Sequence, residues 1–113
     1  MKKRGQVWWI RFDPSEGSEI QKTRPAVILS NNASNKRLQR CIVVPFSSQM
    51  SKIHRAEVEI KFKGKPTKAM VDQLTTVSYN RMLNKAGLIS RENIEQIEKA
   101  IITHLDLPHA EEE

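Results

Sequence analysis

The stretch GSEIQKTRPAVILS, residues 17–30, joins a polar loop directly to an apolar run. The loop carries Glu19, Lys22 and Arg24, and Pro25 then leads into Ala-Val-Ile-Leu, which reads as a buried strand. A strand that only had to be buried can follow almost any turn chemistry. A carboxylate and a guanidinium at its start therefore indicate a site as well as a strand.

Two further segments alternate apolar and polar residues, which is typical of strands with one buried face. They are GQVWWIRFD, residues 5–13, and AEVEIKF, residues 56–62. In the second segment we expect three apolar residues to face inward: Val58, Ile60 and Phe62. We expect the charged residues between them to face solvent: Glu57, Glu59 and Lys61.

Short apolar runs predict the other strands. These are RPAVILSN (24–31) and RCIVVPFS (40–47), each typical of a strand buried on both faces, and AMVDQLTTV (69–77), which follows a turn in KGKPTK (63–68). The Asn-rich segment NNASNKRLQ, residues 31–39, predicts a loop with one helical turn.

The C-terminal part predicts an amphipathic helix. Ser90 is a typical N-cap for RENIEQIEKAIITHLDL, and Pro108 ends the pattern. Isoleucine and leucine recur at helical spacing and give one apolar face: Ile94, Ile97, Ile101 and Leu105. About six short strands and this helix predict an α+β fold that is mainly β, a small and strongly bent β-barrel with the helix packed against it.

Length and charge limit the possible functions. The chain has 113 residues and a net charge of +6, so it is long enough for one domain and is suited to a polyanionic partner. We expect that domain in residues 1–107 and a disordered acidic tail in residues 108–113. The only cysteine, Cys41, lies in an apolar run and is expected to be buried and reduced.

Targeting segments and familiar cofactor motifs are missing from the sequence. The basic N-terminus lacks the apolar region of a signal peptide, and no stretch reaches membrane-spanning length, so we expect a cytoplasmic protein without a membrane partner. There is no P-loop, no G-x-G-x-x-G and no H-E-x-x-H, and the histidines are far apart at positions 54, 104 and 109. We therefore expect no metal and no cofactor.

Several motifs, in this order, resemble those of the MazF/PemK/Kid family of toxin endoribonucleases. They are the D-P-x-x-G-S-E turn, the K-x-R-P-A-V-x-x-S start of the strand, VVPFSSQ and V-D-Q, with NKAGLIS ahead of the terminal helix. The similarity extends over residues 5–107. It implies a single toxin endoribonuclease domain with an SH3-like barrel, which dimerises and cleaves single-stranded RNA at short sequence motifs without a metal.

The resemblance also implies the chemistry of cleavage. In this family the 2′-hydroxyl attacks the adjacent phosphorus, and the products are a cyclic phosphate and a 5′-hydroxyl. Such a reaction needs a group to take the 2′ proton, a group to help the leaving oxygen and positive charge on the phosphorus.

Arg24 is the first candidate catalytic residue, because it matches the catalytic arginine of the family's R-P step. Its guanidinium stays charged and presents a planar fork to phosphate oxygens, so we expect it to clamp the transition state. Ser47 matches a Thr or Ser whose hydroxyl bonds a phosphate oxygen, although a serine here is equally typical of a turn. Glu19 and Asp72 match family acids that act as base or orient Arg24, while a structural salt bridge is an equally good interpretation of both.

Basic and polar residues in the loops are candidates for RNA binding: Lys22, Ser18, Gln73, Lys52 and Arg55. Four further lysines supply positive charge that can follow an RNA backbone, although each is also typical of a solvated surface: Lys61, Lys63, Lys65 and Lys68. Trp8 and Trp9 cannot both face inward. Trp9 therefore supports a dimer contact, stacks on a base or is partly buried in the core.

Two departures from the family pattern leave the division of acid and base roles open. Ile20 replaces a glutamine, and Met70 replaces an arginine of the Kid branch. Two other functions remain: a gyrase poison resembling CcdB, whose aromatic helix end this chain lacks, and a non-catalytic RNA-binding barrel. The resemblance further implies translation inhibition in a type II toxin–antitoxin system, a homodimer, and a cognate antitoxin whose disordered acidic segment neutralises the toxin.

Overall fold

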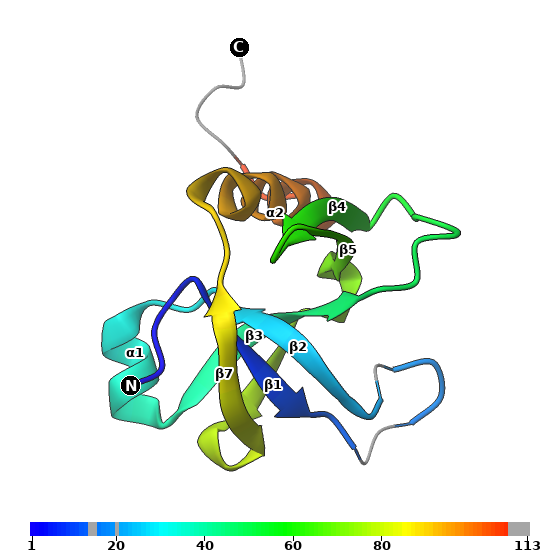
Figure 1. Ribbon diagram of the computed structural model, residues 1–113. Coiled ribbons are helices and arrows are strands. Elements are labelled where there is room, and N and C mark those ends of the chain that lie inside the picture. The colour runs from blue at the N-terminus through cyan, green and yellow to red at the C-terminus, as the bar shows by residue number, and fades with distance from the viewer. Residues whose placement is uncertain (14–15, 20, 109–113) are drawn as a thin grey trace.

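The computed structural model describes residues 1–13, 16–19 and 21–108, which form seven strands and two α-helices (Figure 1). The strands are β1 (Gln6–Arg11), β2 (Thr23–Ile28), β3 (Arg40–Ser47), β4 (Glu57–Phe62), β5 (Lys65–Met70), β6 (Thr75–Ser78) and β7 (Met82–Leu88). The helices are α1 (Asn32–Leu38) and α2 (Arg91–His104), with short 3-10 turns η1 (Val71–Gln73) and η2 (Tyr79–Arg81). Ile20 and all of the predicted tail except Pro108 lie outside the described residues.

The strands form one bent antiparallel sheet in the order β4-β5-β3-β2-β1-β7, and β6 pairs with β3. α2 lies across one end of the sheet, over β4 and β5, and α1 lies at the other end (Figure 1). The predicted α+β class is therefore confirmed. Within the described residues β4 and β7 do not pair, so the sheet is open and the predicted β-barrel is a loose description.

The two faces of the sheet pack into two apolar clusters. One contains Val27, Val44 and Phe46 together with Ile97 of α2, and the other contains Ile28 and buried residues of β1, β3, β6 and β7. Because alternate residues of a strand point to opposite faces, β2 is buried on both, as its continuous apolar run predicts.

The C-terminal helix follows the sequence pattern up to its last turn. Ser90 is the N-cap, and its hydroxyl accepts a hydrogen bond from the Asn93 amide at 3.1 Å. Ile97 is fully buried, and Ile94 and Ile101 pack against the same cluster. Leu105 was expected on this face but is 50% exposed, because the helix ends at His104.

Three other segments differ from the sequence prediction. Residues 69–77 are not one strand, because β5 ends at Met70 and η1 intervenes before β6. The predicted turn at 63–68 is shorter, since β5 already begins at Lys65 after Lys63 and Gly64, which both have positive φ. β7 has no alternating pattern and is a strand because it pairs with β1.

A helix of seven residues, α1, forms where the sequence predicts a loop with one turn. Asn31 caps it, and Asn35 is fully buried with its amide donating to the Ser30 carbonyl at 3.0 Å. The Tyr79 hydroxyl donates to the carbonyl of Asn35 at 2.8 Å. The contact with Tyr79 comes from η2, which is distant in the chain, so the local sequence does not report it.

The cysteine is buried as expected. Cys41 is 1% exposed, and burial raises the pKa of its thiol. In the part of the chain that the structure describes, none of the helices has the length and apolar character needed to cross a membrane.

Candidate active site

The candidate site lies where β2 and β3 separate. The two strands pair from Ala26↔Pro45 to Ile28↔Val43. Before Ala26, β2 pairs only with β1, and beyond Pro45, β3 pairs only with β5, which lies on the edge of β3 opposite to β2. The strand ends that carry Arg24 and Ser47 therefore diverge and leave a hollow between them.

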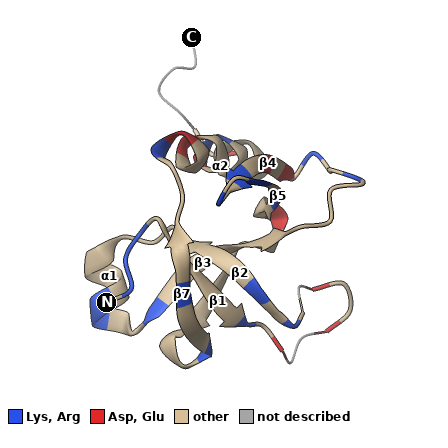
Figure 2. Ribbon diagram, in the orientation of Figure 1, with Lys and Arg blue, Asp and Glu red and all other residues tan. Residues whose placement is uncertain are grey.

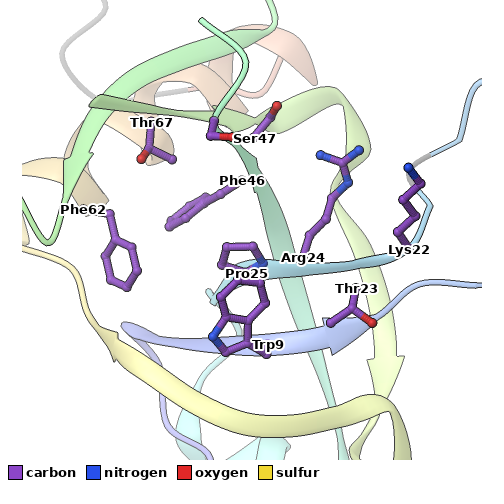
Figure 3. A pocket seen from close by; sticks show the side chains of 10 residues that line it. Trp9, Lys22, Thr23, Arg24, Pro25, Phe46, Ser47, Phe62 and Thr67 are labelled. Atoms are coloured by element: carbon purple, nitrogen blue, oxygen red, sulfur yellow. The ribbon is translucent and has the colours of Figure 1, made fainter. Parts of the chain in front are cut away.

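This hollow is a pocket of about 380 Å³. Its lining comes from β1, β2 and the residues before it, the end of β3, and β4 and β5: Trp9, Lys22, Thr23, Arg24, Pro25, Phe46, Ser47, Ser48, Phe62 and Thr67 (Figure 3). Cations and hydroxyl groups thus surround an apolar, aromatic part, an arrangement suited to a phosphate with an attached base.

Arg24 lies at the start of β2, half-buried. Its Nε donates to the Gln21 carbonyl at 3.0 Å, which fixes the side chain near its base. Figure 3 shows the guanidinium directed from β2 toward the end of β3 that carries Ser47. Pro25 follows where β2 has a neighbour on one side only, so its missing N–H breaks no pairing with β3.

Lys22 has a left-handed backbone, with φ of 69°, which is uncommon for a residue other than glycine. Two hydrogen bonds hold it there. The Asp13 side chain accepts from the Lys22 amide at 2.9 Å, and the Lys22 carbonyl accepts from the Phe12 amide at 2.9 Å. Arg81 adds support by donating to the Arg11 and Asp13 carbonyls at 3.0 and 2.6 Å.

Ser47 is nearly buried, at 9% exposure, at the end of β3. Its hydroxyl oxygen accepts a hydrogen bond from the Gln49 amide at 3.2 Å. Because this contact uses the oxygen as acceptor, the hydroxyl proton can still be donated to a ligand in the pocket.

The two candidate acids lie outside this pocket. Glu19 is exposed, and its carboxylate accepts from the Glu16 amide at 2.9 Å within its own loop. Asp72 is exposed on η1. The structure does bring two predicted RNA-binding residues together, since the Gln73 side chain donates to the Ser18 carbonyl at 3.4 Å and links η1 to the segment 16–19.

Lys52 and Arg55 are exposed on the loop of residues 48–56, between β3 and β4. Figure 2 shows basic residues on this loop, which projects on the same side of the molecule as the segment 16–19. Arg55 contributes to a different hollow beside α2, together with Lys99 and His104. The structure therefore places Lys22, but not Lys52 or Arg55, in the lining of the pocket.

Two expectations about charged residues were wrong. The Lys68 and Glu57 side chains are only 10% and 6% exposed, and they form an ion pair with Nζ and Oε1 3.2 Å apart. Lys68 is therefore not a solvated lysine that follows RNA, and Glu57 does not face solvent. A buried ion pair forms only where the tertiary structure brings the two side chains together. The alternation of residues in one strand predicts which face is exposed but not such a pairing.

Sequence reasoning missed most of the aromatic lining. Phe46 and Phe62 pack edge to face with ring centroids 5.8 Å apart, and both line the pocket. The alternating pattern predicted Phe62 as a core residue, which its partial burial in the first apolar cluster confirms. Trp9 is 39% exposed and lines the pocket, so it is only partly buried, while Trp8 packs in the core. Among the described residues, no group of three or more His, Cys, Asp or Glu side chains is placed to hold a metal ion.

These features define a class of protein: a small α+β domain, mainly β, with a cationic and aromatic pocket of the kind that is typical of nucleic-acid-binding proteins. The comparison with known proteins then identifies the family. Residues 3–105 match the family described as "PemK-like, MazF-like toxin of type II toxin-antitoxin system". The chain belongs to this family.

Curated relatives agree with that assignment. The chain is 34% identical to "Endoribonuclease MazF9" of Mycobacterium tuberculosis, with 95% of this chain and 98% of that protein covered. It is 33% identical to "Endoribonuclease toxin MazF" of Escherichia coli strain K12, covering 86% of this chain and 87% of the relative.

Solved structures have the same fold. MazF from Deinococcus radiodurans superposes with a TM-score of 0.83 at 20% identity, covering 92% of this chain and 96% of that one. A mycobacterial endoribonuclease solved in complex with its cognate antitoxin gives a TM-score of 0.79 at 20% identity, covering 97% of this chain and all of that one.

Proposed function

We propose that this MazF-type endoribonuclease toxin cleaves single-stranded mRNA at short specific sequences, without a metal, and so inhibits translation and growth. The 2′-hydroxyl of the RNA gives up its proton and attacks the adjacent phosphorus, and the bond to the 5′ oxygen breaks as that oxygen takes up a proton. The products are a cyclic phosphate and a 5′-hydroxyl. The observation that carries the proposal is the pocket between the diverging ends of β2 and β3, which presents Arg24 and Ser47 together.

Each lining group has a proposed role. The Arg24 guanidinium binds the phosphate oxygens and stabilises the added negative charge of the transition state, and the Ser47 hydroxyl donates to one of those oxygens. Lys22 adds positive charge at the rim, and Trp9 offers a surface on which a neighbouring base stacks. We propose that Glu19 or Asp72 takes the 2′ proton once bound RNA brings that carboxylate toward the pocket.

The cellular setting is also part of the proposal. A cognate antitoxin with a disordered acidic segment neutralises the toxin by occupying the cationic pocket. We place the protein in the cytoplasm, where mRNA is translated and where the buried Cys41 thiol stays reduced. Fractionation of cells that produce the protein tests this location, and recovery outside the cytoplasm would contradict it.

Chelation provides the direct test of the proposed reaction. We expect the purified protein to cut single-stranded RNA in excess EDTA at its full rate, since arginine and lysine supply the positive charge. We also expect duplex RNA of the same sequence to resist, because paired bases cannot enter an aromatic pocket. Activity lost in EDTA and restored by a divalent ion would contradict the metal-independent reaction. Binding without cleavage would favour a non-catalytic RNA-binding protein.

We further propose that the chain forms a homodimer. β7 lies at one edge of the sheet, and its Leu83 and Leu88 side chains are 51% and 65% exposed. Exposed apolar side chains on an edge strand favour association with another protein surface. Sedimentation at micromolar concentration should give a particle of twice the 13.0 kDa chain mass. A monomer at every concentration tested would rule the homodimer out.

A further inference from the structure

A buried ion pair lies beside the pocket and has no role in the proposed chemistry. Lys68 and Glu57 are both at least nine-tenths buried at their side chains, with Nζ and Oε1 3.2 Å apart. Removing two charges from water is unfavourable, so such a pair contributes little net stability unless further hydrogen bonds satisfy it. Those further bonds indicate what the pair holds in place.

Both partners bind the backbone of the 48–56 loop. The Lys68 ammonium donates to the Lys52 carbonyl at 2.8 Å, and the Glu57 carboxylate accepts from the His54 amide at 2.9 Å. Glu57 is also the first residue of β4, where the loop ends. The ion pair thus attaches the middle of the loop to its far end and to β5.

The near end of the loop is attached to the candidate catalytic serine. Ser47 precedes the loop, and its hydroxyl oxygen accepts from the Gln49 amide. In the pairing of β3 with β5, the residue opposite Ser47 is Lys68. Ser48 and Thr67, the neighbours of these two residues in sequence, both line the pocket. The anchored loop therefore continues directly from the pocket wall.

We propose that Lys68 and Glu57 are positioning residues that hold the 48–56 loop in a fixed position beside the candidate pocket, where it forms part of the RNA-binding surface. The inference rests on the proposed function, and it adds that Lys68 acts through the loop without touching RNA. The fixed backbone presents the exposed Lys52 side chain to the RNA and keeps the Ser47 hydroxyl in place. A mobile loop loses conformational entropy each time RNA binds, and this loss weakens binding. An anchored loop avoids the loss and therefore favours binding.

The test removes both charges together, so that neither is left buried without a partner. In the variant E57L/K68M we expect kcat/KM for single-stranded RNA to fall about tenfold or more, mainly through KM, because part of the RNA-binding surface becomes mobile. Hydrogen exchange at the His54 amide should become faster. The matched control E95L/R91M removes an exposed ion pair of α2, 3.7 Å apart, and should leave both measurements unchanged.

A second variant covers the case in which the double substitution does not fold. Glu57→Gln keeps the shape and an acceptor oxygen but removes the charge that holds Lys68, and we expect KM to rise about threefold or more with kcat within about twofold. Lys68→Arg keeps a cationic donor, so its KM should stay close to the wild-type value. If Lys68 acted only by packing, the changed shape of the side chain would raise KM.

The outcomes separate this inference from the proposed function. A wild-type protein that does not cut RNA contradicts the proposed function. If the wild type is active and a folded E57L/K68M or E57Q variant has an unchanged KM, the positioning role is overturned. Hydrogen exchange at the wild-type His54 amide as fast as at an unprotected amide would overturn it too. A raised KM with faster exchange, beside an unaffected control, supports it.

Discussion

Replacement of Arg24 by alanine is expected to lower kcat for single-stranded RNA by about 100- to 1000-fold, the loss typical of removing one donor that stabilises a transition state. The guanidinium lines the pocket and is held by the Gln21 carbonyl. Its contacts within the protein are few, so the free energy of unfolding should fall by about 1 kcal/mol or less. The melting temperature should then change by only a few degrees. The rate is measured with a labelled oligonucleotide, and circular dichroism follows the fold.

Two further arginine variants make this result specific. Arg24→Lys keeps the charge but loses the planar fork, so it should recover only part of the activity. Arg91→Ala removes an arginine at the start of α2 whose side chain is 93% exposed, and it should cut RNA at the wild-type rate. A folded Arg24→Ala protein with near wild-type activity would show that the site is assigned wrongly.

The same assay distinguishes the two candidate acids. If Glu19 takes the 2′ proton, Glu19→Gln removes the acidic limb of the pH–rate profile, and Asp72→Asn does so if Asp72 is the base. A lower rate with an unchanged profile would show that the carboxylate has a structural role, as the contact between Glu19 and the Glu16 amide favours.

The acidic segment of the cognate antitoxin is expected to abolish cleavage by competing with RNA for the pocket. Lys22 and Arg24 line this pocket beside Trp9 and Phe46, so a peptide with alternating acidic and apolar residues can satisfy both kinds of group as it folds. The chain's net charge of +6 should make the affinity depend on salt, with a fall of about tenfold or more between low and high ionic strength.

Calorimetry at two salt concentrations, with and without an uncleavable RNA analogue, measures this competition. An antitoxin segment in which the acidic residues are replaced by their amides is the matched control and should bind much more weakly. Independent binding of peptide and RNA would contradict a shared pocket. An affinity that does not change with salt would show that apolar contacts dominate.

Much of the fold and part of the site were predictable from local pattern. The apolar run after Arg24 predicted a strand buried on both faces, and Ser90 with the isoleucine spacing predicted α2, because burial and capping leave a periodic trace in sequence. The R-P step predicted Arg24 at a pocket, and the order of motifs predicted the family. The strand and helix predictions depend on residues close together in the chain, whereas the family prediction depends on the order of motifs along residues 5–107.

Only the tertiary structure decided how these elements meet. The pairing of β3 with β2 ends at Pro45, while β3 continues beside β5 on its other edge. This separation of β2 and β3 opens the pocket, which Phe46, Phe62 and Thr67 line. The tertiary structure also places the Lys68 side chain within reach of Glu57, which the alternation of 56–62 had assigned to the solvent face. Pairing between distant strands determines which side chains share a space, and the free energy of a buried charge depends on those neighbours. A local pattern reports the faces of each strand but not the partner that it meets.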